Sequence, residues 1–255
     1  ASLERWPMPC FTLAAAQYPA AAANIACNLE RHLEFVAQAA EQQVQLLVFP
    51  ELSLSGYELA DAAELALTLD DPRLQPLTAA AQSHQMTIIV GTPLRSGQAL
   101  HIAALIFSPN GAVAAYTKQH LHGAEQQRFL PGNGGTLLEI HRQRIALAIC
   151  ADTSQPGHAS AAALAGAQIY AAGVLVSEAG YAKDSAALAG YARRYGMVTL
   201  MANHAAPTGG WIPAGRSAIW DETGALLVAA PDDAPGLIIA DKTRDGWHGR
   251  LCRLS

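Results

Sequence analysis

The sequence predicts an α/β fold in which mixed β-sheets carry helices on their outer faces. Short apolar runs typical of strands alternate along the chain with longer segments that have helix start and stop signals. Helices separate some of the predicted strands and tight turns separate others, so parallel and antiparallel neighbours should share a sheet. The strands show both alternating and continuously apolar patterns, which favours two such layers packed back to back.

The first elements are a strand, a helix and a buried strand. Residues 11–17 are predicted to form the first strand. Asn24 can cap a helix that runs to about Gln43, because apolar side chains recur on one face of this segment. The apolar run over residues 45–50 ends at Pro50, as expected for a short buried strand.

A second helix and three strands complete the first half. Pro72 suits the first turn of a helix that extends to about Gln85. Gly97 and the hairpin signal Asn110-Gly111 separate the strands that follow. These strands are predicted over residues 87–94, 101–108 and 112–117.

The second half opens with a glycine-rich irregular segment from Lys118 to Gly135, and loops of this length are usually functional or disordered. Two helices are predicted next, one ending near Gly166 and one over residues 183–196 with Gly196 as its stop. A turn at 221–224 separates two of the last strands. The predicted strands cover residues 136–140, 144–150, 168–176, 198–203, 216–221, 225–230 and 236–241.

Composition favours a single domain and limits the kinds of partner. The 255 residues contain no composition break and no linker, so residues 1–255 are predicted to form a single domain. Only 15% of residues are charged and 51% are apolar, which suggests that another subunit covers some apolar surface. The net charge of −5 comes without a basic block, which argues against nucleic acid as a partner.

Targeting signals and disulfide patterns are not evident. We find no run of about 18 apolar residues, so no membrane span or membrane partner is expected. The first ten residues lack the pattern of a signal peptide. The four cysteines are scattered without a CxxC pair, which favours reduced thiols and a cytoplasmic location. They are Cys10, Cys27, Cys150 and Cys252.

Three residues suggest chemistry because each ends its own apolar stretch: Glu51, Lys118 and Cys150. A carboxylate can take the thiol proton, the thiolate can attack a carbonyl carbon, and an ammonium can stabilise the oxyanion. If the three converge in space, the chain is a hydrolase of C–N bonds. If they do not, it is an ordinary alanine-rich α/β domain.

Each of the three also has a structural explanation. Cys150 lies at a junction between a strand and a helix, and the unpaired backbone N–H groups at such a junction suit an oxyanion. The structural explanation is that unpaired cysteines are often small core residues. Burial would raise the pKa of Glu51 and make it a usable base, unless it is a solvated residue at a strand end. Lys118 is either a surface charge or an ammonium kept charged by Glu51 or Glu125.

The motifs FPELSLSGY, YTKQHLHGAEQQRFLPG and ICAD resemble those of the nitrilase superfamily of carbon-nitrogen hydrolases. The order and the spacings match, and the downstream segments ALAGAQIY, ARRYGMVTLMANH and GRSAIWDETGALL are also similar. The resemblance covers residues 11 to 240. Three motifs in order, with an ExxRFxPG loop, make it specific.

The resemblance implies roles for five residues. Glu51 would be the general base, Lys118 the oxyanion stabiliser and Cys150 the nucleophile. Glu125 would orient the lysine and the substrate, and the N–H of Ala151 would complete the oxyanion hole. The implied fold is a four-layer αββα sandwich that commonly dimerises into eight layers, with no metal and no organic cofactor. A homodimer or higher homo-oligomer is therefore expected.

Residues after the cysteine carry information on the substrate. Nitrile-cleaving members of the superfamily usually have Cys-Trp-Glu, whereas this chain has Cys150-Ala151-Asp152, which favours a small linear amide. Members that act on carbamoyl amino acids or omega-amides often have an arginine three or four residues after the cysteine, and here Thr153 and Ser154 stand there. Residues at strand mouths and in glycine-rich loops are predicted to line the pocket: Tyr57, Ser177, Glu178, Tyr181, His204 and Trp211.

The prediction is thus thiol-dependent hydrolysis of a non-peptide C–N bond in a small-molecule amide through a Cys150 thioester. N-carbamoyl or nitrile hydrolysis, acyl transfer to an amine, and a catalytically silent binding module remain as alternatives. A metal site at His120 and His122 with Glu125 is disfavoured because no further ligand pair is evident. A two-domain dinucleotide enzyme is disfavoured because no glycine fingerprint follows the first strand.

Overall fold

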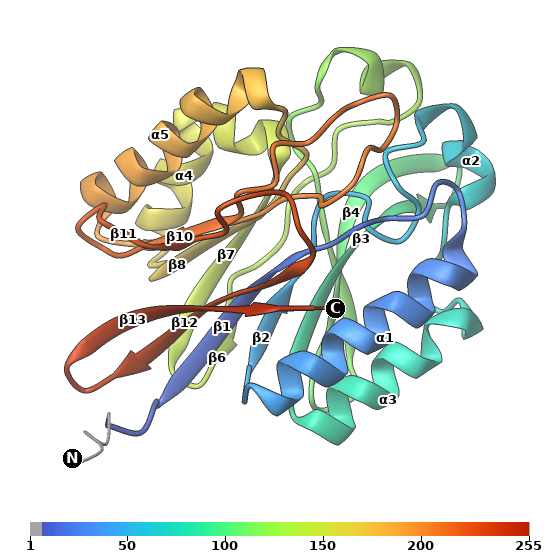
Figure 1. Cartoon of the computed structure of the whole chain (residues 1–255). Helices are drawn as coiled ribbons and strands as arrows, with labels where there is room; N and C mark the ends of the chain where they lie inside the picture. Colours follow the sequence, from blue (N-terminus) through green and yellow to red (C-terminus); the bar gives the residue numbers. More distant parts are fainter. Residues whose placement is uncertain (1–6, 255) are drawn as a thin grey trace.

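The computed structural model describes residues 7–254 and has the predicted αββα architecture. Two sheets pack face to face, with α1 and α3 outside one sheet and α4 and α5 outside the other (Figure 1). The first half contains β1 (Phe11–Gln17), α1 (Ile25–Glu41), β2 (Leu46–Val48), α2 (Ala62–Leu65), α3 (Gln75–His84), β3 (Thr87–Ser96), β4 (Ala99–Phe107) and β5 (Val113–Thr117).

The second half supplies the other sheet and returns to the first. It contains β6 (Leu138–Ile140), β7 (Gln143–Ile149), α4 (Pro156–Leu164), β8 (Ile169–Gly173), α5 (Glu178–Tyr195), β9 (Val198–Ala202), β10 (Ala218–Trp220), β11 (Leu226–Ala229), β12 (Gly236–Thr243) and β13 (Gly246–Arg253). Four short 3-10 helices lie in the connections: η1 (Leu59–Asp61), η2 (Pro72–Leu74), η3 (Gly123–Gln127) and η4 (Cys150–Ser154).

Both sheets are mixed, as predicted. One has the order β13-β12-β1-β2-β3-β4-β5 and the other β11-β10-β9-β8-β7-β6. In each, three central strands are parallel, β1, β2 and β3 in one and β7, β8 and β9 in the other. Helices connect these parallel strands, and the outer pairs are antiparallel. The two halves therefore share a βαβαβ plan, although the sequence shows no repeat.

The side chains of β1 point alternately to the two faces of its sheet, which explains the four layers. Leu13 and Ala15 pack between the sheets, whereas Ala14 and Ala16 pack beneath the outer helices. A strand buried on both faces reads as a continuous apolar run, which is the pattern of residues 11–17. The small alanine side chains let the outer helix layer approach the sheet closely.

Three elements differ from the sequence prediction. Helix α5 starts at Glu178, five residues before the predicted Lys183. The predicted helix from Pro72 divides into the short η2 and the α-helix α3, which begins at Gln75. Strand β13 was not predicted, because its residues are half-buried or exposed and its apolar pattern is weak. None of the described helices is long and apolar enough to cross a membrane.

Candidate active site

The fold brings the ends of three strands to one edge of the sandwich. Glu51 follows β2, Lys118 follows β5, and Cys150 follows β7. Strand β5 is antiparallel to β4, which is antiparallel to β3, so β5 ends at the same edge as β2. The carboxyl ends of parallel strands are the usual position of ligand sites in α/β sheets.

Glu51, Lys118 and Glu125 form a buried ion cluster. The Lys118 Nζ atom lies 2.5 Å from Glu51 Oε1 and 2.9 Å from each carboxylate oxygen of Glu125. The Tyr57 hydroxyl donates to Glu125 Oε1 at 2.6 Å, and the backbone N–H of His122 donates to Glu125 Oε2 at 2.8 Å. Glu125 is therefore fixed from several directions and in turn holds the amine of Lys118.

Burial and neighbouring charges shift the pKa values of this cluster. Burial raises the pKa of Glu51 to about 7, although the charge of Lys118 opposes the rise. Burial acts to lower the pKa of Lys118, but the negative charges around it, chiefly that of Glu51, outweigh this effect and raise the pKa. Lys118 therefore stays an ammonium, while Glu51 can exchange a proton near neutral pH.

Cys150 lies at a strained turn that opens to a cavity. Its φ of 42° is in the left-handed region, which is unfavourable for residues with a side chain. The thiol is half-buried and lies 3.4 Å from the carbonyl oxygen of Leu175. Burial, followed by the charge of Glu51, raises the pKa of the thiol, whereas Lys118 lowers it. The thiol therefore needs a base to become a thiolate, and the Glu51 Oε2 atom has no hydrogen-bond partner among the described residues.

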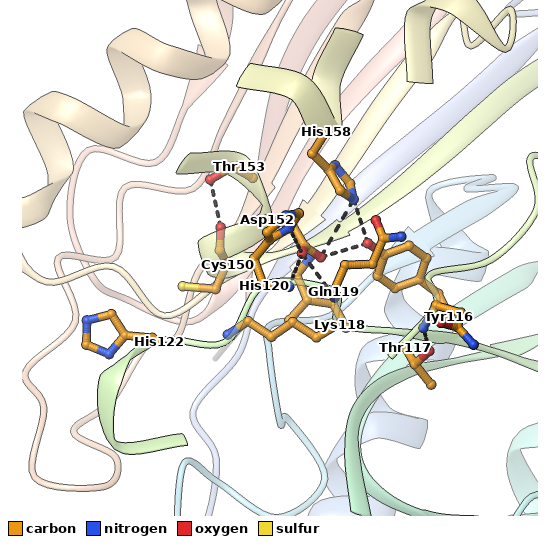
Figure 2. A network of polar contacts seen from close by, with 12 residues as sticks. Tyr116, Thr117, Lys118, Gln119, His120, His122, Cys150, Asp152, Thr153 and His158 are labelled. Atoms are coloured by element: carbon orange, nitrogen blue, oxygen red, sulfur yellow. Dashed lines mark hydrogen bonds and ion pairs between the residues drawn. The ribbon is translucent and has the colours of Figure 1, made fainter. Parts of the chain in front are cut away.

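Asp152 connects the cysteine turn to the lysine loop. Its buried carboxylate accepts hydrogen bonds from the backbone N–H groups of Ile149 (3.0 Å), Gln119 (3.1 Å) and His120 (2.9 Å) and from the Tyr116 hydroxyl (2.7 Å). Figure 2 shows this network, with the side chains of Lys118 and Cys150 extending from either side of it into the same space. One carboxylate thus fixes the backbone on both sides of the site.

Asp152 is itself supported by a chain of aromatic and imidazole groups. The Tyr116 hydroxyl donates to Asp152, so its oxygen accepts from Nε2 of His158 at 2.7 Å. The Tyr170 hydroxyl then donates to Nδ1 of His158 at 2.7 Å. Burial lowers the pKa of His158, which keeps this imidazole neutral at pH 7.

Two glycines allow the backbone around Glu51 to pass between the sheets. A Cβ atom at Gly91 of β3 would lie 2.3 Å from the backbone nitrogen of Leu52. A Cβ atom at Gly173 of β8 would lie 2.6 Å from the carbonyl oxygen of Phe49. Neither distance is possible without movement of the backbone, so the position of Glu51 depends on both glycines.

Glu51, Glu125 and Cys150 line one cavity of about 330 Å³, and Lys118 contacts both carboxylates. Of the residues predicted to contact substrate, Tyr57, Ser177 and Trp211 line this cavity together with Ala151. His122, Ser154, Gly180, Lys183 and Asp184 also line it and were not predicted. Gly180 was missed because Glu178–Ala182 was not assigned to a helix, whereas this segment begins α5. Lys183 and Asp184 fall in the predicted helix, but the sequence does not show which face of that helix meets the cavity.

Three other residues predicted to bind substrate lie outside the cavity lining. Glu178 forms an exposed ion pair with Arg216 at 2.7 Å. The Tyr181 hydroxyl donates to the carbonyl oxygen of Arg216 at 2.7 Å. His204 is fully buried, and its Nε2 atom donates to the carbonyl oxygen of Glu51 at 2.7 Å, so it contacts the backbone that carries the carboxylate.

A larger cavity of about 700 Å³ lies beside α4, but neither Glu51 nor Cys150 lines it, so it is not the candidate site. His120 and His158 line it and both contact Asp152. Among residues 7–254, no group of three or more His, Cys, Asp or Glu side chains is arranged to hold a metal ion.

An αββα sandwich with a glutamate, a lysine and a cysteine at one edge defines a class of hydrolases, and comparison with known proteins identifies it. The family profile described as carbon-nitrogen hydrolase matches residues 12–248. The chain belongs to the carbon-nitrogen hydrolase family, in the amidase-like branch of the nitrilase superfamily.

Individual relatives agree with this assignment. A deaminated glutathione amidase of Escherichia coli O157:H7 is 30% identical over 234 residues, covering 85% of this chain and 84% of the relative. An (R)-stereoselective amidase of Pseudomonas sp. is 31% identical, but the match covers 57% of this chain and 53% of the relative. The chain thus spans about half the length of the first curated relatives that it matches.

A solved structure is similar over almost the whole chain. It is the E41L mutant of the amidase from Nesterenkonia sp. AN1, with the acetamide moiety of fluoroacetamide added covalently at its active-site cysteine. Its TM-score is 0.85 at 25% identity, and the alignment covers 93% of this chain and 92% of that chain.

Proposed function

We propose that this protein hydrolyses a non-peptide C–N bond in a small linear amide through a thioester on Cys150. The observation that carries the proposal is the convergence of Glu51, Lys118 and Cys150 from three separate strand ends. Glu51 and Cys150 line one cavity, and Lys118 is ion-paired with Glu51. The covalent adduct on the cysteine of the Nesterenkonia amidase supports the same role for a thiol in this fold.

In the first half of the reaction, Glu51 takes the proton of the Cys150 thiol, and the thiolate attacks the amide carbon. Lys118 and the backbone N–H of Ala151 stabilise the resulting oxyanion. Glu51, now protonated, donates its proton to the departing nitrogen. The C–N bond breaks, ammonia or an amine leaves, and an acyl thioester remains on Cys150.

In the second half, Glu51 removes a proton from water, and the hydroxide attacks the thioester carbon. The same oxyanion contacts apply. The C–S bond then breaks, the sulfur recovers a proton from Glu51, and the carboxylic acid leaves. A pKa of about 7 suits Glu51 to this alternation between base and acid. Glu125 holds the ammonium of Lys118, with 2.9 Å from Nζ to each of its carboxylate oxygens.

The test is ammonia release from a panel of primary amides, with the mass of the intact protein measured after rapid quenching. We expect turnover and an acyl adduct in the wild type and neither in Cys150→Ala. Cys27→Ala is the matched control, because Cys27 is also a free, half-buried cysteine but lies on α1. Full activity in Cys150→Ala would exclude the mechanism.

Further arms of the same assay address the other reactions of this chemistry. Nitriles and N-carbamoyl compounds are added to the panel, and ammonia release confined to one of these classes would replace the amide as substrate. Hydroxylamine is included as an acyl acceptor, and hydroxamate formed faster than the free acid would indicate acyl transfer to an amine. No adduct and no release with any compound would indicate a silent binding module.

A further inference from the structure

The first turns of α5 form a polar notch in the wall of the cavity. Ser177, Gly180 and Asp184 lie on one face of this helix, and all three line the cavity. A Cβ atom at Gly180 would lie 3.6 Å from Asp184 Oδ2 and 3.8 Å from Ser177 Oγ. The missing side chain therefore leaves a space that a carboxylate oxygen and a hydroxyl both border.

Neither polar group of the notch is used by the described residues. Ser177 stands at the N-cap of α5, but its hydroxyl makes no capping hydrogen bond. The carboxylate of Asp184 is half-buried and has no hydrogen bond or ion pair within residues 7–254. A half-buried carboxylate without a partner is unfavourable, because burial removes water without supplying a replacement. Burial accordingly raises the pKa of Asp184, and the charge of the neighbouring Lys183 offsets only part of this rise.

The full negative charge of Asp184 favours a cation in this notch, against the roughly half positive charge at the N-terminus of α5. Asp184 is half-buried, whereas its neighbour Lys183 is exposed. Water therefore solvates the ammonium of Lys183 better than it solvates the carboxylate of Asp184. Above the pKa of Glu51, which is about 7, the carboxylates of Glu51, Glu125 and Asp184 outnumber the ammonium groups of Lys118 and Lys183 around the cavity. A bound cation would compensate this excess of negative charge.

The position of the buried cluster indicates which part of the substrate enters the notch. The nitrogen that leaves must lie beside Glu51, and Glu51 and Lys118 are almost completely buried. The remainder of the substrate, its acyl chain, then has the rest of the cavity lining to extend along, and α5 with its N-cap supplies Ser177, Gly180, Lys183 and Asp184 to that lining.

We propose that the substrate is a primary amide whose acyl chain carries a protonated amine, and that Asp184 and the Ser177 hydroxyl bind this ammonium. The inference rests on the proposed amidase function and deepens it. Gly180 provides the space for the ammonium, and Lys183 opposes its binding through like charge.

The experiment compares three probes of equal length at pH 8: cationic 5-aminopentanamide, neutral hexanamide and anionic glutaramate. Shorter and longer chains are run beside them. We expect the wild type to favour the cation in kcat/KM by about tenfold or more, the size of one charge-assisted hydrogen bond. Asp184→Asn should abolish this preference by lowering kcat/KM for the cationic amide to about the value for hexanamide.

Two further variants separate recognition from folding. Gly180→Ala should exclude the ammonium while preserving the helix, because alanine is a better helix former and its methyl group would meet only ordinary contacts. Lys183→Gln should raise kcat/KM for the cationic amide and lower it for glutaramate. A wild type that turns over hexanamide or glutaramate as well as the cation, or an Asp184→Asn variant with unchanged preference, would overturn the proposal.

A binding measurement keeps this proposal separate from the proposed function. Butylammonium should slow alkylation of Cys150 by iodoacetamide, butanol should do so less, and Asp184→Asn should remove the difference. Cys150-dependent hydrolysis of neutral amides without protection by butylammonium would leave the hydrolase standing and overturn the ammonium site. Protection that requires Asp184, without hydrolysis of any amide, would support the site and overturn the hydrolase.

Discussion

At the scale of single residues, Glu51 is held between two opposing effects. Burial disfavours its charged form, and Lys118 at 2.5 Å favours it. The balance leaves a pKa of about 7, so the carboxylate is half ionised at neutral pH. An exposed glutamate would be fully ionised and a weaker base, and an unpaired buried one would stay protonated.

This balance predicts the pH dependence of the reaction. The general base must be ionised in the free enzyme, so kcat/KM should fall about tenfold per pH unit below pH 7 and level off above it. The measurement is kcat/KM for a neutral amide from about pH 4 to about pH 9, a range that includes both the raised and the ordinary pKa of a glutamate. In Glu51→Gln the dependence should vanish with the activity. A midpoint near 4.5, the ordinary value of the carboxyl, would show that burial does not control this group.

Glu125 provides a second prediction, because its charge raises the pKa of Glu51 while its oxygens hold Lys118. Glu125→Gln should therefore move the midpoint of the pH profile to lower pH. It should also reduce kcat by about tenfold to a hundredfold, because the amine of Lys118 loses its fixed position. The matched control is Tyr57→Phe, which removes one hydrogen bond to Glu125 and keeps its charge. An unchanged midpoint in Glu125→Gln would contradict the coupling.

At the scale of elements, the close approach of β8 to the segment before Glu51 sets the third prediction. Gly173→Ala places a methyl group within 2.6 Å of the carbonyl oxygen of Phe49 and should destabilise the fold by about 1–3 kcal/mol. Gly190→Ala in α5 has open space around the new atom and should stabilise by up to about 1 kcal/mol. Urea denaturation measures both free energies of unfolding. Equal effects would show that the backbone near Glu51 yields without cost.

Asp152 provides the fourth prediction, because it joins the turn of η4 to the loop after β5. In Asp152→Asn the amide cannot accept from all the donors that the carboxylate serves, so kcat should fall at least about tenfold with KM nearly unchanged. Alkylation of Cys150 by iodoacetamide should slow as well, which a loss of stability alone would not cause. Tyr116→Phe removes one of these hydrogen bonds and should have a smaller effect. Normal alkylation in Asp152→Asn would show that the turn holds its shape without this carboxylate.

The elements that sequence predicts best are those with a strong periodic signal. Strand β1 and helix α1, with its cap at Asn24, were predicted within two residues, because burial of both strand faces and of one helix face fixes their patterns. Strand β13 lacks such a signal, since edge strands carry polar and charged residues that discourage further pairing. The start of α5 was missed because Gly180 in its first turn resembles a loop residue.

At the scale of the whole molecule, the candidate site exists only where the two sheets meet. Glu51 and Lys118 come from one sheet and Cys150 from the other, each from the end of a strand. The sequence predicts such strand-end residues well, because their apolar runs stop abruptly. It does not predict side chains that reach the cavity from a helix face, such as Asp184, or a contact such as Asp152 to Tyr116, because these depend on how distant segments pack.

The last prediction concerns association of whole molecules, which the sparse charge of the chain led us to expect. Leu164 on α4 is 91% exposed, and alanines of the same helix line the 700 Å³ cavity beside it. Helices α4 and α5 form an outer layer of the sandwich (Figure 1), so pairing of two such layers would cover this leucine and yield eight layers. We expect a homodimer in sedimentation-velocity experiments and its dissociation in Leu164→Glu, whereas Leu69→Glu, at an exposed leucine outside α4 and α5, should remain dimeric. A monomeric wild type, or a Leu164→Glu variant that stays dimeric, would show that this helical layer is not the interface.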